Sequence, residues 1–175
     1  ATSPRLNKSI KLFYNTVNKT TDKLTMLSEN DRKAILELIH RQVVPAIGCT
    51  EPIAVALCAA KAKELLGCTP ERIDVRLSAN VLKNAMGVGI PGTGMIGLPI
   101  AIALGVLIGD SEKQLEVLKG CTPESVKLGK QMIAENRIDI KLETEDTNKL
   151  FINITCTSGN EMAEARIKGP HTNFV

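Results

Sequence analysis

Four segments of the sequence alternate between apolar and polar residues, and this alternation constrains the fold more than any other feature. They span residues 72–78, 137–143, 150–157 and 162–168. A period of two is typical of β-strands with one buried and one solvated face. The last two segments flank a Ser-Gly-Asn hairpin signal, in which Gly159 is expected to adopt a positive φ. We therefore predict an α+β fold, a mostly antiparallel sheet of about four strands with helices on one face.

Helical patterns fill much of the remaining chain. An amphipathic helix is predicted to begin at Ser28, an N-cap residue, and to end at Pro45. Residues 52–66 are apolar on nearly all sides in their first half, which predicts a buried helix. A Gly-rich loop leads into a second apolar helix over 100–109, and two short surface helices are predicted at 111–120 and 123–136.

Size and composition exclude several classes of protein. The chain has 175 residues, of which 43% are hydrophobic, enough for the core of about one domain. Only 2% are aromatic, so aromatic platforms that stack nucleic-acid bases are scarce. The apolar run at 95–109 is shorter than the ~20 residues that span a membrane. We expect neither a nucleic acid nor a membrane as a partner.

The first 25 residues differ in composition from the rest. They carry five Lys or Arg and one Asp, a net charge of +4, which leaves −1 for residues 26–175 because the whole chain carries +3. This basic, Ser/Thr-rich extension has the composition of an organellar transit peptide, an upstream extension or a cloning remnant. The folded domain is expected over 26–175, in the cytoplasm or, if the extension is a transit peptide, in an organelle.

Five cysteines occur at positions 49, 58, 68, 121 and 156. Their odd number and the absence of a CxxC motif favour free thiols in a reducing compartment. No zinc site or iron–sulfur cluster made wholly from this chain is expected, because the nearest thiols are separated by eight or nine residues.

Cys49 lies in the segment AIGCTEP. Proline disfavours a helical conformation in the residue before it, so we expect Glu51 to be extended or capping and Pro52 to begin the helix. Cys49 would then lie within one turn of the positive end of a helix dipole, which lowers a thiol pKa. The Glu51 carboxylate would oppose this effect if it lay near the sulfur. The alternative is a buried structural cysteine, which suits Cys58.

The Gly-rich segment formally contains a G-x-G-x-x-G motif at Gly87, Gly89 and Gly92. Its context argues against a dinucleotide site, since the preceding strand ends near Ser78, eight residues too early. The glycines either permit close helix packing or expose backbone N–H groups at a helix start, where they would bind an anion such as a substrate carboxylate.

Three stretches together carry a resemblance to a known family: GCTEPIAVALCAAKA, LKNAMGVGIPGTGMIGLPIAIALG and the closing GPHTNFV. From about Met26 to Val175 the chain resembles the N-terminal part of the L-cysteine desulfidase family, which is related to the alpha chain of iron–sulfur-dependent L-serine dehydratases. The resemblance implies a lyase that converts L-cysteine to pyruvate, ammonia and sulfide, or L-serine to pyruvate and ammonia. It also implies a [4Fe-4S] cluster that acts as Lewis acid for the leaving group.

The resemblance also implies site residues. Cys49 matches the cysteine proposed as the base that removes the α-proton of the substrate. The residues expected to contact the amino-acid substrate are Glu51, Asn84, Gly92, Thr93, Gly94, His171 and Asn173, with Lys83 and Thr172 as further candidates. For Lys83, a solvated position at a helix end is the competing interpretation.

Members of that family are longer, and their cluster ligands lie in a part that this chain lacks. We therefore expect the 175-residue piece to be inactive alone, with the cluster ligands outside it. We also expect it to contact the missing C-terminal part or a second copy in a homo-oligomer. The alternatives are L-serine dehydratase activity, a non-catalytic interaction domain and, least favoured, a nucleotide-dependent oxidoreductase.

Overall fold

The computed structural model describes residues 27–42 and 46–175, in two units that are treated separately. The predicted extension at 1–25 and the predicted helix end at Pro45 lie outside these residues. The first unit contains helix α2 (Glu29–Gln42). As predicted, Ser28 caps this helix, because its Oγ accepts a hydrogen bond from the backbone N–H of Asp31 at 3.1 Å.

The second unit, which we call the body, is built on a four-stranded sheet. Its strands are β1 (Arg72–Leu77), β4 (Ile138–Leu142), β5 (Phe151–Ser158) and β6 (Glu161–Lys168), in the order β4-β1-β5-β6. All four alternating segments form strands, and Gly159 in the β5–β6 turn has a φ of 56°. The predicted α+β class is confirmed. The sheet is mixed, however, because β1 and β4 are parallel while the other pairs are antiparallel.

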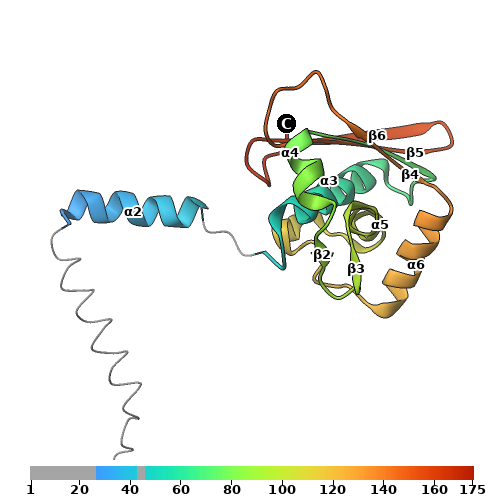
Figure 1. The fold of residues 1–175 in the computed structure, drawn as a ribbon, viewed down its shortest axis with the longest axis horizontal. Coiled ribbons are helices and arrows are strands. Elements are labelled where there is room, and N and C mark those ends of the chain that lie inside the picture. The colour runs from blue at the N-terminus through green and yellow to red at the C-terminus, as the bar shows by residue number, and fades with distance from the viewer. Residues whose placement is uncertain (1–26, 43–45) are drawn as a thin grey trace, which may run out of the picture. The chain divides into compact units, whose positions relative to one another are not determined.

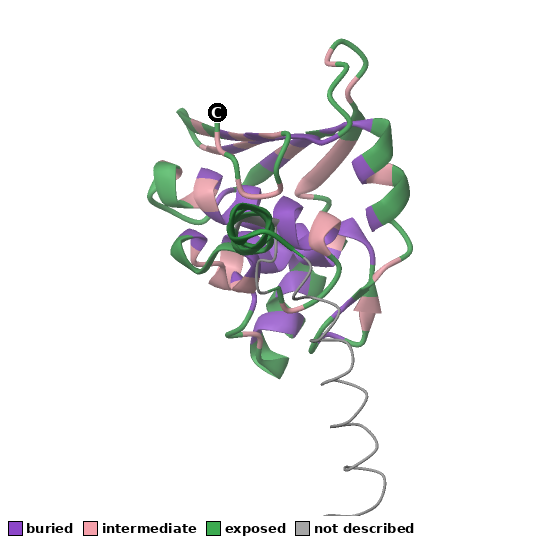
Figure 2. Cartoon of the chain, turned by 90° about the vertical axis from the view of Figure 1, so that its left-hand side faces the viewer, coloured by how far each residue is buried: buried purple, intermediate pink, exposed green. Residues whose placement is uncertain are grey.

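The helices of the body lie on one side of this sheet, as predicted (Figures 1 and 2). Helix α3 (Thr50–Leu66) packs directly on β5 and β6, and the Cys58 thiol donates a hydrogen bond to the Ala165 carbonyl at 3.2 Å. Helix α5 (Leu98–Ile108) packs on α3, and helix α6 (Pro123–Ala134) packs on α5. Figure 2 shows that the buried residues concentrate in α3, α5 and the sheet. The Gly-rich segment therefore leads into a buried helix, as expected.

Short elements connect these layers. Helix α4 (Ala79–Ala85) follows β1, and the hairpin strands β2 (Gly89–Ile90) and β3 (Met95–Ile96) precede α5. The surface helix predicted at 111–120 is instead the shorter 3₁₀ segment η1 (Ser111–Glu116), because Gln114 adopts a φ of 50° that interrupts regular helix. The predicted cap of α6 is confirmed, since the Thr122 hydroxyl accepts from the Ser125 N–H at 3.2 Å.

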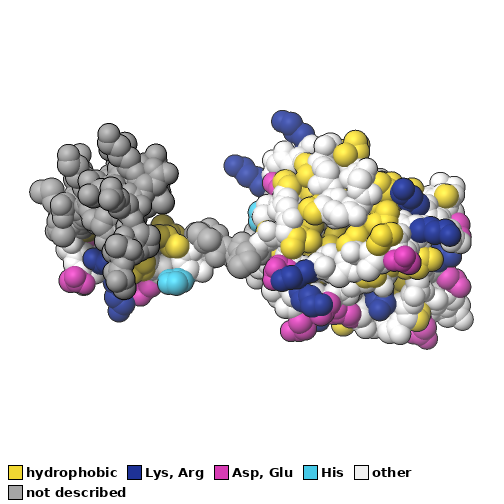
Figure 3. All heavy atoms as spheres, turned by 90° about the horizontal axis from the view of Figure 1, so that it is seen from below, with side chains coloured by type: hydrophobic (Ala, Val, Ile, Leu, Met, Phe, Trp, Pro, Cys, Tyr) yellow, Lys and Arg dark blue, Asp and Glu magenta, His cyan; other side chains and the backbone are white. Residues whose placement is uncertain are grey.

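The surface of the body away from the sheet has a mixed character. Figure 3 looks at this side and shows hydrophobic side chains among scattered charged ones. Ile96 and Met86 are among the exposed large hydrophobic residues of the body. Among the helices of the described residues, none has the length and apolar content needed to cross a membrane.

Candidate active site

Cys49 is the N-cap residue of α3, with φ −58° and ψ 132°, and the helix begins at Thr50. The prediction that Glu51 is extended or capping and that Pro52 begins the helix is wrong, because the helix begins two residues earlier, at Thr50. Pro52 occupies the third helical position, where backbone N–H groups have no partner within the helix. A proline there removes no helical hydrogen bond, so the preceding residues can be helical.

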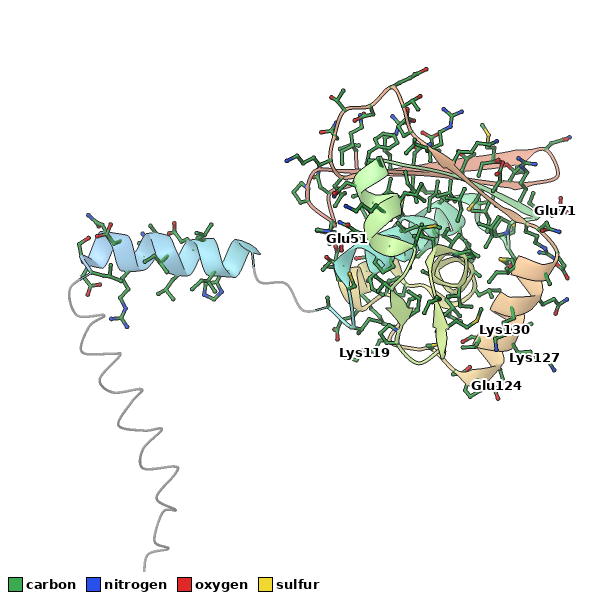
Figure 4. All side chains as sticks on the ribbon, viewed as in Figure 1. Glu51, Glu71, Lys119, Glu124, Lys127 and Lys130 are labelled. Carbon is green, nitrogen blue, oxygen red and sulfur yellow. The ribbon has the colours of Figure 1, made fainter. Side chains whose placement is uncertain are left out.

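A chain of hydrogen bonds links Cys49 to helix α4 through Glu51. The Cys49 Sγ donates to Glu51 Oε2 at 3.2 Å, and the Thr50 hydroxyl donates to the same oxygen at 3.2 Å. The other carboxylate oxygen, Oε1, accepts from Asn84 Nδ2 at 3.3 Å. Figure 4 shows Glu51 at the start of α3, beside α4. Three of the predicted site residues, Cys49, Glu51 and Asn84, thus form one connected group.

The electrostatics of this group follow from the position of the Glu51 carboxylate. Partial desolvation, followed by the hydrogen bond to Glu51, raises the pKa of the Cys49 thiol above its ordinary value. Hydrogen bonds from the backbone of Glu51 and Thr50 at the helix start favour the thiolate but do not outweigh these effects on the pKa. Desolvation also favours the neutral form of Glu51, but the hydrogen bonds from Cys49, Asn84 and Thr50 outweigh it and lower the pKa of that carboxyl. At neutral pH the pair is therefore a thiol beside a carboxylate.

The Gly-rich turn lies against the residue before Cys49. A Cβ atom placed on Gly48 would lie 3.0 Å from Pro91 Cγ, so the two segments are in close contact. Gly92 and Gly94, with φ of 77° and 64°, adopt a backbone conformation that side chains disfavour. Two of the predicted substrate-binding residues therefore belong to a turn that borders the start of α3.

The conformation of this turn differs from the prediction of an anion-binding helix start. The glycines lie between β2 and β3, and the Gly97 N–H before α5 donates to the Val88 carbonyl at 2.9 Å. The Thr93 N–H donates to the Ile90 carbonyl at 3.2 Å. The N–H groups of Thr93 and Gly97 are therefore bonded within the hairpin and are not free donors, and Gly92 and Gly94 lie one strand before α5 rather than at its start.

Thr93 has a structural role in the turn. Its side chain is buried, its hydroxyl donates to the Ile90 carbonyl at 2.7 Å, and the same oxygen accepts from the Met95 N–H at 2.9 Å. These bonds direct the hydroxyl into the hairpin. Thr93 thus shapes the turn, and the backbone of Gly92 and Gly94 forms its outer part.

His171 and Asn173 lie in the turn that follows β6. Asn173 Nδ2 donates to the Lys168 carbonyl at 3.0 Å, and the buried His171 Nε2 has no hydrogen-bond partner among the described residues. Strand β6 packs on α3, where the Cys58 thiol donates to the Ala165 carbonyl. No hydrogen bond within the described residues joins this turn to Cys49.

Cys121 is a neighbour of the site that the sequence did not indicate. A Cβ atom on Gly92 would lie 3.7 Å from the Cys121 Sγ, and the half-buried Cys121 directly precedes the cap of α6. The spacing of Gly92 and Cys121 along the chain carries no signal of this proximity, because the two residues meet only in the folded body.

The described residues offer no candidate metal centre. Within residues 27–42 and 46–175, no three His, Cys, Asp or Glu side chains gather closely enough to hold a metal ion. The five cysteines are free thiols, of which Cys58 and Cys156 are buried. The residues present therefore do not fit an iron–sulfur cluster.

The sequence is similar to proteins named UPF0597 proteins. One from Bacteroides fragilis is 65% identical over 149 residues, which are 85% of this chain and 35% of that protein. One from Bacteroides thetaiotaomicron is 65% identical over 147 residues, and one from Porphyromonas gingivalis is 48% identical over 149 residues, covering 84% and 85% of this chain and 34% of each relative. No family model matches the chain. The chain spans about a third of the length of these curated relatives, and UPF0597 proteins are its close homologues.

Proposed function

We propose that this chain is part of a lyase that eliminates sulfide from L-cysteine to give pyruvate and ammonia, with Cys49 as the base. The observation that carries the proposal is the hydrogen-bonded chain from Cys49 through Glu51 to Asn84, bordered by the Gly-rich turn. A thiol and a carboxylate at the start of α3, with an amide from α4, combine a group that can accept a proton with groups that fix its position.

The elimination begins with the α-proton of the substrate, which the Cys49 thiolate accepts. The electron pair of the Cα–H bond forms a Cα–Cβ double bond, and the Cβ–S bond breaks. The departing sulfide takes the proton from Cys49, which restores the thiolate. The aminoacrylate product tautomerises to an imine, which water hydrolyses to pyruvate and ammonia.

Glu51 and Asn84 would prepare Cys49 for this step. Glu51 accepts the thiol hydrogen bond at 3.2 Å and is therefore placed to receive the proton when the thiolate forms. Asn84 binds the opposite carboxylate oxygen at 3.3 Å, which fixes the orientation of Glu51. In this proposal both residues position the base, and the backbone of Gly92 and Gly94 faces the substrate carboxylate.

The resemblance to L-cysteine desulfidases implies a [4Fe-4S] cluster, which would supply a Lewis acid for the leaving group. The described residues do not fit such a cluster, and each step assigned above uses only the side chains of this chain. The ligands of the cluster would then lie in another part of the complete protein.

The test is to replace Cys49 in the complete protein, purified without oxygen. Loss of a general base costs about 10²–10⁴-fold in rate, so Cys49→Ala should reduce sulfide and pyruvate formation from L-cysteine by at least about 100-fold. Cys68→Ala is the matched control, because Cys68 is an exposed thiol that follows the opposite end of α3. It should retain normal activity.

Two other results would change the assignment. Pyruvate formation from L-serine with little sulfide formation from L-cysteine would favour the dehydratase reaction at the same site. Full activity in Cys49→Ala and Cys49→Ser would remove Cys49 from catalysis and favour a non-catalytic interaction domain.

A further inference from the structure

The face of the sheet opposite the helices carries charge in two rows. The strand register places Lys141, Arg76, Asn153 and Arg166 side by side across all four strands, and we call them the cationic row. Two residues away along each strand, the register places Asp139, Asp74, Thr155 and Glu164 side by side, and we call them the acidic row. The face therefore has a positive stripe beside a negative one.

This face is open in the body. Helices α3, α5 and α6 all lie on its other side (Figures 1 and 2). A hollow of about 370 Å³ extends across it and is lined by residues of both rows. Asn153, only 8% exposed, forms part of the lining and accepts a hydrogen bond from Arg166 Nε at 2.9 Å.

The arrangement within each row is unfavourable by itself. Like charges directly opposite on neighbouring strands destabilise a sheet, and Asp74 lies opposite Asp139 while Arg76 lies opposite Lys141. Ion pairs compensate in part, since Lys141 lies 2.7 Å from Asp139 and Arg166 lies 2.8 Å from Glu164. Arg72, at the start of β1, also lies 2.6 Å from Asp74 and 3.5 Å from Asp139. Exposed pairs of this kind contribute little stability, so the striped pattern is not explained by the stability of one copy alone.

We propose that two copies of this chain associate through this face. A rotation of 180° about an axis parallel to the rows and midway between them places the cationic row of one copy over the acidic row of the other. The same rotation places the acidic row of the first copy over the cationic row of the second, as a two-fold interface requires. The strands of the two sheets then lie antiparallel, within the range of aligned sheet packing.

One pair of charges beyond the two rows agrees with this arrangement. Glu143 follows β4 on the cationic side of the face, and Arg72 begins β1 on the acidic side. The rotation brings Glu143 to the level of the partner's Arg72.

The size of the face sets the strength of the association. Four strands about 4.8 Å apart and about six residues long at about 3.4 Å per residue cover roughly 400 Å² per copy. Stable complexes bury about 800 Å² per partner, so this contact belongs to the weak class, and screening of its exposed charges makes it sensitive to salt.

Sedimentation of the complete chain tests the proposal. The dimer fraction should increase with protein concentration at about 0.05 M salt and decrease at about 0.5 M, where the Debye length is much shorter. Lys127→Glu on α6, on the opposite side of the sheet, is the matched control and should leave this equilibrium unchanged. A chain that stays monomeric at all concentrations at low salt would overturn the proposal.

Charge reversal gives the sharper result. R76E/K141E makes both rows negative and D74K/D139K makes both positive, so neither variant should dimerise with itself. An equimolar mixture should form the heterodimer, because each negative row then faces a positive one. If wild type dimerises but the mixture does not, the interface lies elsewhere. The single substitutions R76E and D74K repeat the test if circular dichroism shows that a double variant does not fold.

Discussion

At the scale of the residue, the chemistry of Cys49 depends on one distance. The helix N-terminus lowers a thiol pKa, while a nearby carboxylate raises it. The sequence shows that both groups are present but not how far the carboxylate lies from the sulfur. The structure places the Glu51 carboxylate 3.2 Å from the Cys49 sulfur, and the pKa of the thiol is raised. A thiolate formed at this position is consequently a stronger base than an ordinary one, although it is less populated at neutral pH.

Replacing Glu51 with Gln should make Cys49 more reactive toward alkylation. The substitution removes the negative charge and the carboxylate acceptor that raise the thiol pKa, so the thiolate fraction at a given pH increases. The rate of iodoacetamide labelling of Cys49, followed by peptide mass spectrometry between pH 7 and 9, measures this effect. The exposed Cys68 in the same sample is the internal control.

The same substitution separates a positioning role from simple inhibition of the thiol. If Glu51 positions the base, Glu51→Gln should lower the rate of sulfide release even though Cys49 is alkylated faster. Parallel increases in both rates would show that Glu51 only suppresses the thiolate. An unchanged alkylation profile would contradict the hydrogen bond between Glu51 and Cys49.

At the scale of the element, the contact between α3 and α5 holds the site in place. Gly105 of α5 lies so close to α3 that a Cβ atom on it would overlap the Ala56 carbonyl oxygen. Both elements are helix backbones in a core of close-packed aliphatic side chains, so neither can move without disturbing the other. Close helix packing, one of the two interpretations of the Gly-rich segment, is therefore found at Gly105 within α5 and not in that segment, where a Cβ atom on Gly87, Gly89 or Gly94 would meet no neighbour within 4 Å.

Gly105→Ala should lower the free energy of unfolding by about 1–3 kcal/mol, the usual cost of overpacking a core. The gain in helix propensity from Gly to Ala, about 1 kcal/mol, is too small to reverse this loss. Urea denaturation of the two proteins measures the difference. Gly120→Ala is the control, since a Cβ atom there meets no neighbour within 4 Å. Equal stability of the Gly105 and Gly120 variants would contradict the close approach of α3 and α5.

At the scale of the whole molecule, the core contains two buried thiols whose ionisation opposes folding. Desolvation is the main cause that raises the pKa of Cys156 to about 12 and raises the pKa of Cys58 further above its ordinary value of 9.0. Above pH 9 these thiols ionise in the unfolded chain but stay neutral in the folded one. Because the unfolded state then binds fewer protons, stability falls as pH rises.

The free energy of unfolding should therefore decrease above pH 9 by about 1.4 kcal/mol per pH unit for each buried thiol. Chemical denaturation between pH 8 and 10.5 measures this slope. The double variant Cys58→Ala, Cys156→Ala should be less stable at every pH but should show a shallower decrease. Cys68→Ser, at an exposed position, should keep the wild-type slope. A double variant with the wild-type slope would assign the alkaline loss to other groups.

Local pattern was sufficient to predict the four strands of the main sheet and most helices of this protein, but not the short hairpin of β2 and β3. Alternation over 72–78, 137–143, 150–157 and 162–168 identifies four strands because one buried face imposes a period of two whatever the partner strand is. The same pattern cannot distinguish a parallel from an antiparallel neighbour. The pairing of β1 with β4 is parallel because the long helical connection between them returns the chain to its starting end.

The candidate site was predictable residue by residue, but its connections were not. Cys49 and Glu51 are two positions apart, so their proximity is local, whereas Asn84 reaches Glu51 only because α4 folds back beside α3. The inward direction of the Thr93 hydroxyl and the contact of Gly92 with Cys121 likewise depend on the β2–β3 hairpin. The sequence alone determined which elements form and which groups could react, since both follow from short-range pattern and residue chemistry. Only the tertiary structure decided which groups meet, because the distances that set the Cys49 pKa and the register that aligns the charged rows arise from packing between distant segments.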